Sequence, residues 1–186
     1  VIVLVRRKLD ITDPKLQQVI LEDFAQMKSR SQDLKGDFYF CCLGTTIKDA
    51  GTKEQFRKID FTAIVEFAQI AKSHQARAFT LISAAGANAN SMIFYNKTKG
   101  ETEEAVRSLE FARLVILRPG LLLGQRKTLR LGEQTFIHIS TALAKIVPRS
   151  IVNRFTTPCD RLAQRMVQEG LRMNPGELTI QASDIQ

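Results

Sequence analysis

Short apolar runs alternate along this chain with longer stretches in which apolar residues recur at helical spacing. Apolar runs of about four to eight residues are typical of buried strands, and their alternation with helices is typical of a parallel sheet covered on its faces. The pattern therefore predicts an α/β fold with a doubly wound parallel sheet. The expected strands are Val1 to Val5, Gln18 to Asp23, Phe38 to Leu43, Ala78 to Ser83, Leu114 to Leu117 and Leu178 to Gln181.

The clearest helical pattern spans Lys53 to Ser73, where an apolar stripe recurs at helical spacing. A second helix carries Tyr95 and runs to about Leu109. Two more are expected at about Glu133 to Ile146 and Pro158 to Met173, and a proline suits the first turn of the latter. Because no proline- or glycine-rich linker occurs, we expect the 186 residues to form a single domain with a small substrate region at about 121–175.

The first expected strand starts at Val1 and ends before Arg6 and Arg7, and no glycine-rich turn precedes it. In a doubly wound sheet of strand order 3-2-1-4-5-6, strand 1 lies between strands 2 and 4. If Val1 to Val5 is strand 2, the central strand is not in the sequence, which would leave two unpaired edges inside a buried sheet. We therefore expect roughly 25 to 30 residues upstream, comprising a strand, a glycine-rich loop and a helix.

The charge of the chain is strongly positive. Lysine and arginine number 27 against 19 acidic residues, which gives a formal charge of +8. A charge of this size attracts phosphates, nucleic acid or acidic surfaces. The cations cluster at Arg6 to Lys8 and at Arg126 to Arg130, without the interleaved aromatic residues of single-strand binders. This distribution argues against a dedicated nucleic-acid domain.

The cysteines indicate a reducing compartment. There are three, of which Cys41 and Cys42 are adjacent, so they make no disulfide framework. The apolar runs fall short of the roughly 18 residues that a membrane helix needs. His74 and His138 have no second ligand at metal-binding spacing. We expect a cytoplasmic protein with no metal site and no membrane partner.

A tyrosine and a lysine four residues apart are the most informative chemical feature. Tyr95 and Lys99 would lie on one helix face, so both head groups can act on one bound molecule. A free tyrosine has a pKa of about 10, and a neighbouring ammonium lowers it by favouring the phenolate. Ser83 closes an expected strand twelve residues before Tyr95. The same spacing also occurs by chance on solvated helices, so the rest of the chain has to decide whether this pair is functional.

Five motifs in order along the chain resemble a known family. They are Arg6-Arg7, Asp23-Phe24, Leu43-Gly44-Thr45, Ser83 with Tyr95 and Lys99, and Arg118-Pro119-Gly120. Placed at strand ends in this order, they resemble the short-chain dehydrogenase/reductase superfamily and are most similar to its atypical branch. The resemblance covers nearly all of the chain and implies a Rossmann-like domain.

The resemblance also implies roles for these residues. Tyr95 would be the general acid that protonates a carbonyl oxygen, Lys99 would lower its pKa and bind the nicotinamide ribose, and Ser83 would hold the substrate oxygen. Arg6 and Arg7 would hold the 2′-phosphate of NADP, which guanidinium groups suit, whereas an acidic residue there would favour NAD. The other cofactor-binding residues would be Asp23, Phe24, Leu43, Gly44, Thr45, Arg118, Pro119 and Gly120.

Two functions from different classes stay open. One is an NADP-dependent oxidoreductase that reduces a small carbonyl compound. The other is an NADP(H)-binding regulatory or scaffold protein with little or no turnover, which would grip a protein partner. The sequence departs from the family pattern in lacking the glycine-rich phosphate loop, and Asp60 stands where the best-known members place a catalytic asparagine. The oligomeric state also stays open, and a homodimer is one of the options, since in many members the helix of the catalytic tyrosine pairs between subunits.

Overall fold

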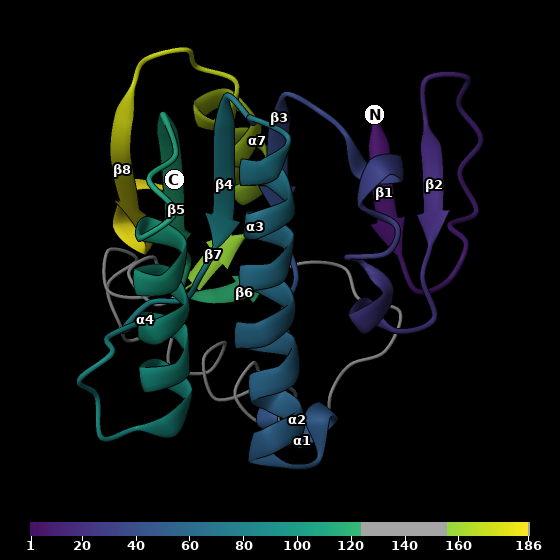
Figure 1. Cartoon of the computed structure of the whole chain (residues 1–186). Helices are drawn as coiled ribbons and strands as arrows, with labels where there is room; N and C mark the ends of the chain where they lie inside the picture. The colour runs from purple at the N-terminus through teal and green to yellow at the C-terminus, as the bar shows by residue number, and fades with distance from the viewer. Residues whose placement is uncertain (124–155, 186) are drawn as a thin grey trace.

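Four parallel strands form the main sheet of the protein (Figure 1). The computed structural model describes residues 1–123 and 156–185. The main sheet has the order β3 (Phe38–Cys41), β4 (Ala78–Ile82), β5 (Arg113–Arg118) and β8 (Gly176–Gln181). Every neighbouring pair in it is parallel. The predicted α/β fold with a parallel sheet is therefore confirmed, and its strand boundaries differ from the prediction by at most two residues at either end.

Two smaller parallel pairs accompany the main sheet. β1 (Ile2–Val5) pairs with β2 (Gln17–Ile20), which is shorter than predicted and ends before Asp23. β6 (Leu121–Leu123) pairs with β7 (Thr156–Pro158). The sequence did not predict this second pair, because strands of three residues are too short to show a periodicity.

The predicted helix from Lys53 to Ser73 is present as one continuous element. It consists of α2 (Lys53–Arg57), a π-helical turn η3 (Lys58–Ala63) and α3 (Ile64–Ser73). The Tyr95 helix is α4 (Phe94–Arg107), and the last long helix is α7 (Cys159–Gly170), with Pro158 at its N-cap. The expected helix 133–146 and most of the expected substrate region lie outside the described residues.

Short elements complete the described chain. They are α1 (Ile47–Ala50) and the 3-10 turns η1 (Phe24–Gln26), η2 (Ser31–Leu34) and η4 (Ala182–Asp184). No helix in the described ranges is both long and apolar enough to cross a bilayer.

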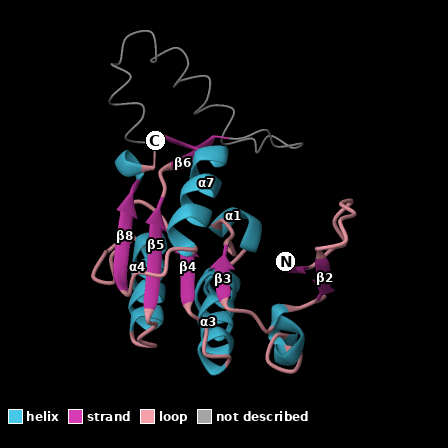
Figure 2. Cartoon of the chain, turned by 90° about the horizontal axis from the view of Figure 1, so that it is seen from above, coloured by secondary structure: helices cyan, strands magenta, loops and turns pink. Residues whose placement is uncertain are grey.

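Helices cover both faces of the main sheet (Figure 2). Leu114 and Ile116 of β5 pack with α3 and α4, whereas Val115 and Leu117 of the same strand pack with α7. Strand side chains alternate between the faces, so a strand buried on both sides reads as a continuous apolar run. This explains why the sequence of β5 could be recognised.

The sheet is interrupted between β1 and β3. Both strands are parallel to their own partners, but no ladder joins β1 to β3 in the described part of the chain. In space the β1–β2 pair lies beside β3, and β1 is the strand nearer to β3 (Figure 1). In the doubly wound order 3-2-1-4-5-6, β2 and β1 correspond to strands 3 and 2, and β3, β4 and β5 correspond to strands 4, 5 and 6. β8 follows as a last strand, and no described strand takes the central position 1.

Candidate functional site

Loops at the carboxyl ends of the main-sheet strands hold the candidate residues. The N–H of Ser83, directly after β4, donates to the carbonyl of Leu117 on β5 at 2.7 Å. The N–H of Ala85 donates to the carbonyl of Pro119 at 2.8 Å. The N–H of Gly120 donates to Thr157 Oγ1 at 3.0 Å. Ligands of open parallel sheets bind at this edge, and Ser83, Pro119 and Gly120 lie there.

A buried ion pair stands at the centre of the site. Lys99 Nζ lies 2.9 Å from Asp60 Oδ1, and the two side chains are 6% and 0% exposed. The other carboxylate oxygen of Asp60 accepts the N–H of Thr45 at 2.8 Å. A Cβ on Gly44 would lie 3.3 Å from Asp60 Oδ1 and 3.6 Å from Lys99 Nζ, so glycine leaves room for this pair. Asp60 therefore ties the lysine to the loop after β3.

The π-helical turn brings Asp60 into this position. It interrupts the long helix at Lys58–Ala63, and such turns occur frequently at functional sites. The hydroxyl of Thr102 on α4 donates to the carbonyl of Asp60 at 2.7 Å. The same hydroxyl lies 2.8 Å from the carbonyl of Thr98. The turn and α4 are thus locked together next to Lys99.

Tyr95 lies on α4 one turn before Lys99 and is half-buried. Its ring packs against Phe56 with a centroid separation of 5.5 Å. Burial raises the pKa of Tyr95 above its ordinary value of 10.0, the charge of Lys99 lowers it, and the charge of Asp60 raises it. Lys99 thus acts in the expected direction, but the net pKa of Tyr95 is raised, because burial has the larger effect and Asp60 opposes the lysine.

Ser83 presents a buried hydroxyl at the same edge. The residue is 6% exposed, and its Oγ has no hydrogen-bond partner among the described residues. Buried polar atoms in folded proteins are nearly always paired, so an unpaired hydroxyl is available to a bound group. The loop that follows Ser83 reaches α4, because the N–H of Asn88 donates to the carbonyl of Asn96 at 3.0 Å. Ser83 and Tyr95 thus belong to connected elements.

Gly100, next to Lys99 on α4, has a packing role that the sequence reasoning did not single out. A Cβ there would lie 2.1 Å from the backbone N of Ala89. Only glycine lets the loop after Ser83 cross α4 so closely. The signal was available in the sequence as a glycine directly after Lys99, in the interior of a helix where it costs stability.

The two cations predicted to bind phosphate lie at the other side of the interruption. Arg6 and Arg7 follow β1 and are exposed. Asp23 caps η1 by accepting the N–H of Ala25 at 3.0 Å, and it lies 3.5 Å from Lys58 Nζ. The Ala25 hydrogen bond and the charges of Lys58 and Arg6 keep the pKa of Asp23 below its ordinary value. The ends of β1 and β2 therefore share one charged edge.

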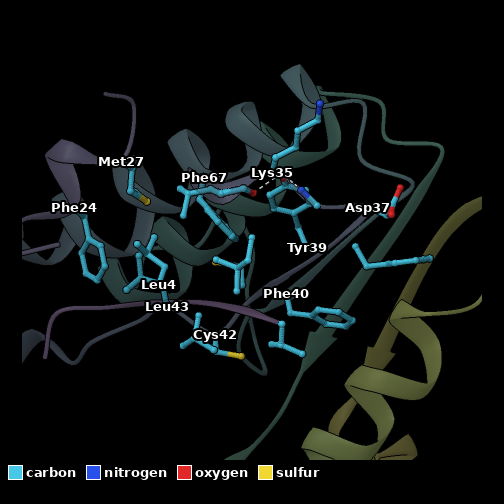
Figure 3. A pocket seen from close by; sticks show the side chains of 17 residues that line it. Leu4, Phe24, Met27, Lys35, Asp37, Tyr39, Phe40, Cys42, Leu43 and Phe67 are labelled. Atoms are coloured by element: carbon cyan, nitrogen blue, oxygen red, sulfur yellow. Dashed lines mark hydrogen bonds between the residues drawn. The ribbon is translucent and has the colours of Figure 1, made fainter. Parts of the chain in front are cut away.

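Other predicted cofactor residues have structural roles. Phe24 and Leu43 line a groove between β1 and β3 (Figure 3). The guanidinium of Arg118 donates to both carboxylate oxygens of Glu103 at 2.9 and 2.6 Å. Glu103 is fully buried, and its hydrogen bonds raise the pKa of Arg118. A cofactor contact at residue 118 would therefore come from its backbone. Within residues 1–123 and 156–185, no group of three or more candidate metal ligands occurs.

Comparison with known proteins places the chain among named relatives, although no family model matches it. It is 34% identical over 166 residues to the mitochondrial protein fmp52 of Emericella nidulans, covering 88% of this chain and 71% of the relative. It is 41% identical over 126 residues to FMP52 of Debaryomyces hansenii, covering 66% of this chain and 54% of the relative. Protein HTATIP2 of Rattus norvegicus is 37% identical over 131 residues, covering 69% and 54%. The chain thus spans little more than half the length of several curated relatives that it matches.

Solved structures support the fold. MoeE5 in complex with UDP-glucuronic acid and NAD matches with a TM-score of 0.70 and 12% identity, covering 97% of this chain and 67% of that one. A dTDP-4-dehydrorhamnose reductase from Bacillus anthracis in complex with NADP matches with a TM-score of 0.65 and 12% identity, covering 97% and 73%. At such low identity the likeness establishes a Rossmann-like fold and no more.

The relatives correct one expectation and confirm another. The predicted cytoplasmic location is contradicted, because the FMP52 relatives are named as mitochondrial proteins. The resemblance inferred from five motifs is confirmed by relatives that extend over most of the chain. The chain belongs to the atypical short-chain dehydrogenase/reductase family that contains the FMP52 and HTATIP2 proteins.

Proposed function

We propose that this protein is an NADP-dependent oxidoreductase that reduces a small carbonyl compound. The observation that carries the proposal is the buried Lys99, one helical turn after Tyr95 and held against the loop of Gly44. Structural neighbours of the chain were solved with NAD or NADP. A buried lysine beside a tyrosine at the carboxyl edge of a parallel sheet is suited to proton transfer on a bound molecule.

The residues present fit a nicotinamide dinucleotide. The bare backbone at Gly44 permits close approach, Lys99 offers donors for ribose hydroxyls, and the unpaired Ser83 hydroxyl faces no competing partner in the described chain. Exposed Arg6 and Arg7 suit a 2′-phosphate, since guanidinium binds phosphate in a bidentate manner. This pair is the basis for proposing NADP over NAD.

When bound, the cofactor would supply the hydride that reduces the carbonyl carbon. The chain would supply the proton and the orientation. The raised pKa of Tyr95 keeps the phenol protonated at neutral pH, so its Oη can donate a proton to the carbonyl oxygen as that oxygen gains charge. Ser83 Oγ would donate a hydrogen bond to the same oxygen, and Asp60 would hold Lys99 in place.

A second candidate is a cofactor-binding regulatory protein with little turnover. The observation that favours it is the partnering of Lys99 with a buried carboxylate, which offsets the charge that would otherwise activate Tyr95. Such a protein would use the cofactor to order its surface for a protein partner. It needs the cofactor residues but has no need of the phenol.

Thermal denaturation with each cofactor tests the first half of the proposal. A ligand at 100 times its Kd stabilises the native state by about 2.7 kcal/mol. Because the proposal gives NADPH the lower Kd, NADPH should raise Tm more than NADH does at the same concentration. Arg6→Glu should abolish that preference, whereas the matched control Arg161→Glu, exposed on α7, should leave it. Equal responses to both cofactors would overturn the preference for NADP, and no response to either would overturn cofactor binding.

Tyr95→Phe separates the two functions. For the enzyme, the variant should lose NADPH-dependent reduction across a panel of aldehydes and ketones while the Tm shift by NADPH is kept. If the wild-type protein binds NADPH but reduces no member of the panel, and Tyr95→Phe changes nothing, the regulatory function is favoured instead.

A further inference from the structure

Three arginine side chains surround one buried carboxylate at the amino end of the main sheet. The side chain of Glu169, on α7, is 2% exposed. Its Oε2 lies 3.4 Å from an Nη of Arg113, the first residue of β5. Its Oε1 lies 3.4 Å from an Nη of Arg165 and 3.4 Å from an Nη of Arg172. This arginine cluster, formed by Arg113, Arg165 and Arg172, lies at the edge of the sheet opposite to the candidate active site.

The carboxylate of Glu169 neutralises only one of the three positive charges. A second carboxylate close to β5 is that of Glu177, the register partner of Leu114. Leu114 packs on the face of the sheet that α3 and α4 cover, and Glu177 binds Arg107 of α4 at 2.6 Å. The C-terminus of α7 adds roughly half a negative charge. Among the described groups, about one and a half positive charges are therefore left over at the arginine cluster.

The arginine cluster also has more donors than Glu169 can use. A guanidinium carries five N–H donors, whereas a carboxylate has about four acceptor sites. Nε of Arg113 and Nε of Arg165 are buried and lack a hydrogen-bond partner in the part of the chain that the structure describes. The side chains of Arg165 and Arg172 are 37% and 50% exposed, so they are accessible to a ligand from solvent. A Cβ on Gly176, the register partner of Arg113, would meet nothing within 4 Å, so there is open space beside this strand end.

We propose that the arginine cluster binds a dianionic phosphate group, either of inorganic phosphate or of a small phosphate monoester. Guanidinium groups bind phosphate oxygens through two parallel N–H bonds. A phosphate group carries about −1.5 to −2 charges at neutral pH and has three strong acceptor oxygens. It therefore matches both the excess charge and the three guanidinium groups, whereas a carboxylate compensates one charge only. The site is independent of the cofactor and of any turnover at Tyr95.

Nuclear magnetic resonance of the arginine Nε–H groups tests this binding. Burial slows solvent exchange at the Nε–H groups of Arg113 and Arg165, so both signals should be observable. The protein is titrated at constant ionic strength with inorganic phosphate and, separately, with glycerol 3-phosphate, and sodium chloride is the control for screening. Both signals should shift and saturate with phosphate but not with chloride. Saturation by inorganic phosphate would identify free phosphate as a sufficient ligand, and saturation by glycerol 3-phosphate alone would identify a monoester.

Two glutamine variants with the same change in charge form a matched pair. Arg172→Gln removes the most exposed guanidinium of the cluster. Lys28→Gln removes an exposed cation between η1 and η2. Loss of the charge-assisted hydrogen bonds of Arg172 should weaken phosphate binding by about tenfold or more. Lys28→Gln should leave the affinity unchanged, and melting without phosphate checks that both variants are folded.

Three results would overturn the proposal. Equal weakening by the two variants would show that phosphate follows the overall positive charge of the protein. Equal shifts with chloride and with phosphate would show screening without a site. Unshifted Nε–H signals of Arg113 and Arg165 at high concentrations of both phosphate compounds would show that the arginine cluster only ties α7 to β5.

Discussion

Replacing Asp60 by asparagine should lower the free energy of unfolding by about 3 kcal/mol. Lys99 is 5% exposed and its ammonium lies 2.9 Å from Asp60, so the variant leaves a buried charge without its counter-ion. Removing one partner of a buried ion pair typically costs about 3–5 kcal/mol, and asparagine keeps an acceptor for the N–H of Thr45, which favours the lower end. For a chain of this size the loss corresponds to a fall in Tm of roughly 6–12 °C.

A double-mutant cycle distinguishes the ion pair from simple loss of packing. Lys99→Met removes the buried ammonium and keeps most of the apolar stem, and by itself it leaves Asp60 without a counter-ion. The double variant should be more stable than the sum of the single effects predicts, because it leaves no unpaired charge. Additive losses in urea denaturation would refute the reasoning that the two groups are electrostatically coupled.

Asp60→Asn also has a spectroscopic consequence. The protein has two tyrosines and no tryptophan, so a Tyr39→Phe background leaves Tyr95 as its one phenol. The charge of Asp60 raises the pKa of Tyr95, and Asp60→Asn should therefore lower it, whereas Lys99→Met should raise it further. Tyrosinate absorbance followed against pH measures both. The charges of Lys99 and Asp60 also act on the buried thiol of Cys41. Burial raises the pKa of that thiol to about 12, which keeps it neutral through most of the titration. An unchanged Tyr95 titration in folded Asp60→Asn would contradict the role given to Asp60.

Three further outcomes are expected from buried groups. Glu103→Gln should cost about 3 kcal/mol in urea denaturation, because its carboxylate is fully buried between two arginines. Burial raises the pKa of Cys41 from 9.0 to about 12, so the unfolded chain loses this proton at lower pH than the folded chain does. The free energy of unfolding should therefore fall as pH rises from 9 towards 12, and Cys41→Ala should flatten that slope. Gly100→Ala should lower the free energy of unfolding by about 2 kcal/mol or more, because its Cβ would overlap the backbone of Ala89. Gly36→Ala, where a Cβ meets nothing within 4 Å, should leave Tm unchanged in the same melting experiment.

Local patterns predicted the elements of this fold better than the contacts between them. The helix from Lys53 to Ser73 was recognised because its apolar residues recur at helical spacing. The spacing of Tyr95 and Lys99 is likewise a local property of one helix. The pairing of Lys99 with Asp60 joins two helices, so no periodicity could reveal it.

The electrostatics of the site depended on that non-local information. The sequence suggested that Lys99 lowers the pKa of Tyr95, whereas the structure adds the opposing charge of Asp60 and the burial beside Phe56. Arg118 was predicted from its motif as a cofactor contact, and only the fold shows its guanidinium bound to Glu103. Motifs predicted the candidate residues, and packing decides what each side chain is free to do.

The groove and the candidate active site are linked through the geometry of the sheet. Arg6 follows β1 on one side of the groove, whereas Gly44 and Lys99 lie on the other side, after β3 and on α4. Among the described contacts, these halves are joined by the Lys58–Asp23 ion pair and by apolar packing around Phe67. A dinucleotide that contacts both Arg6 and Lys99 would need one defined separation of these two halves.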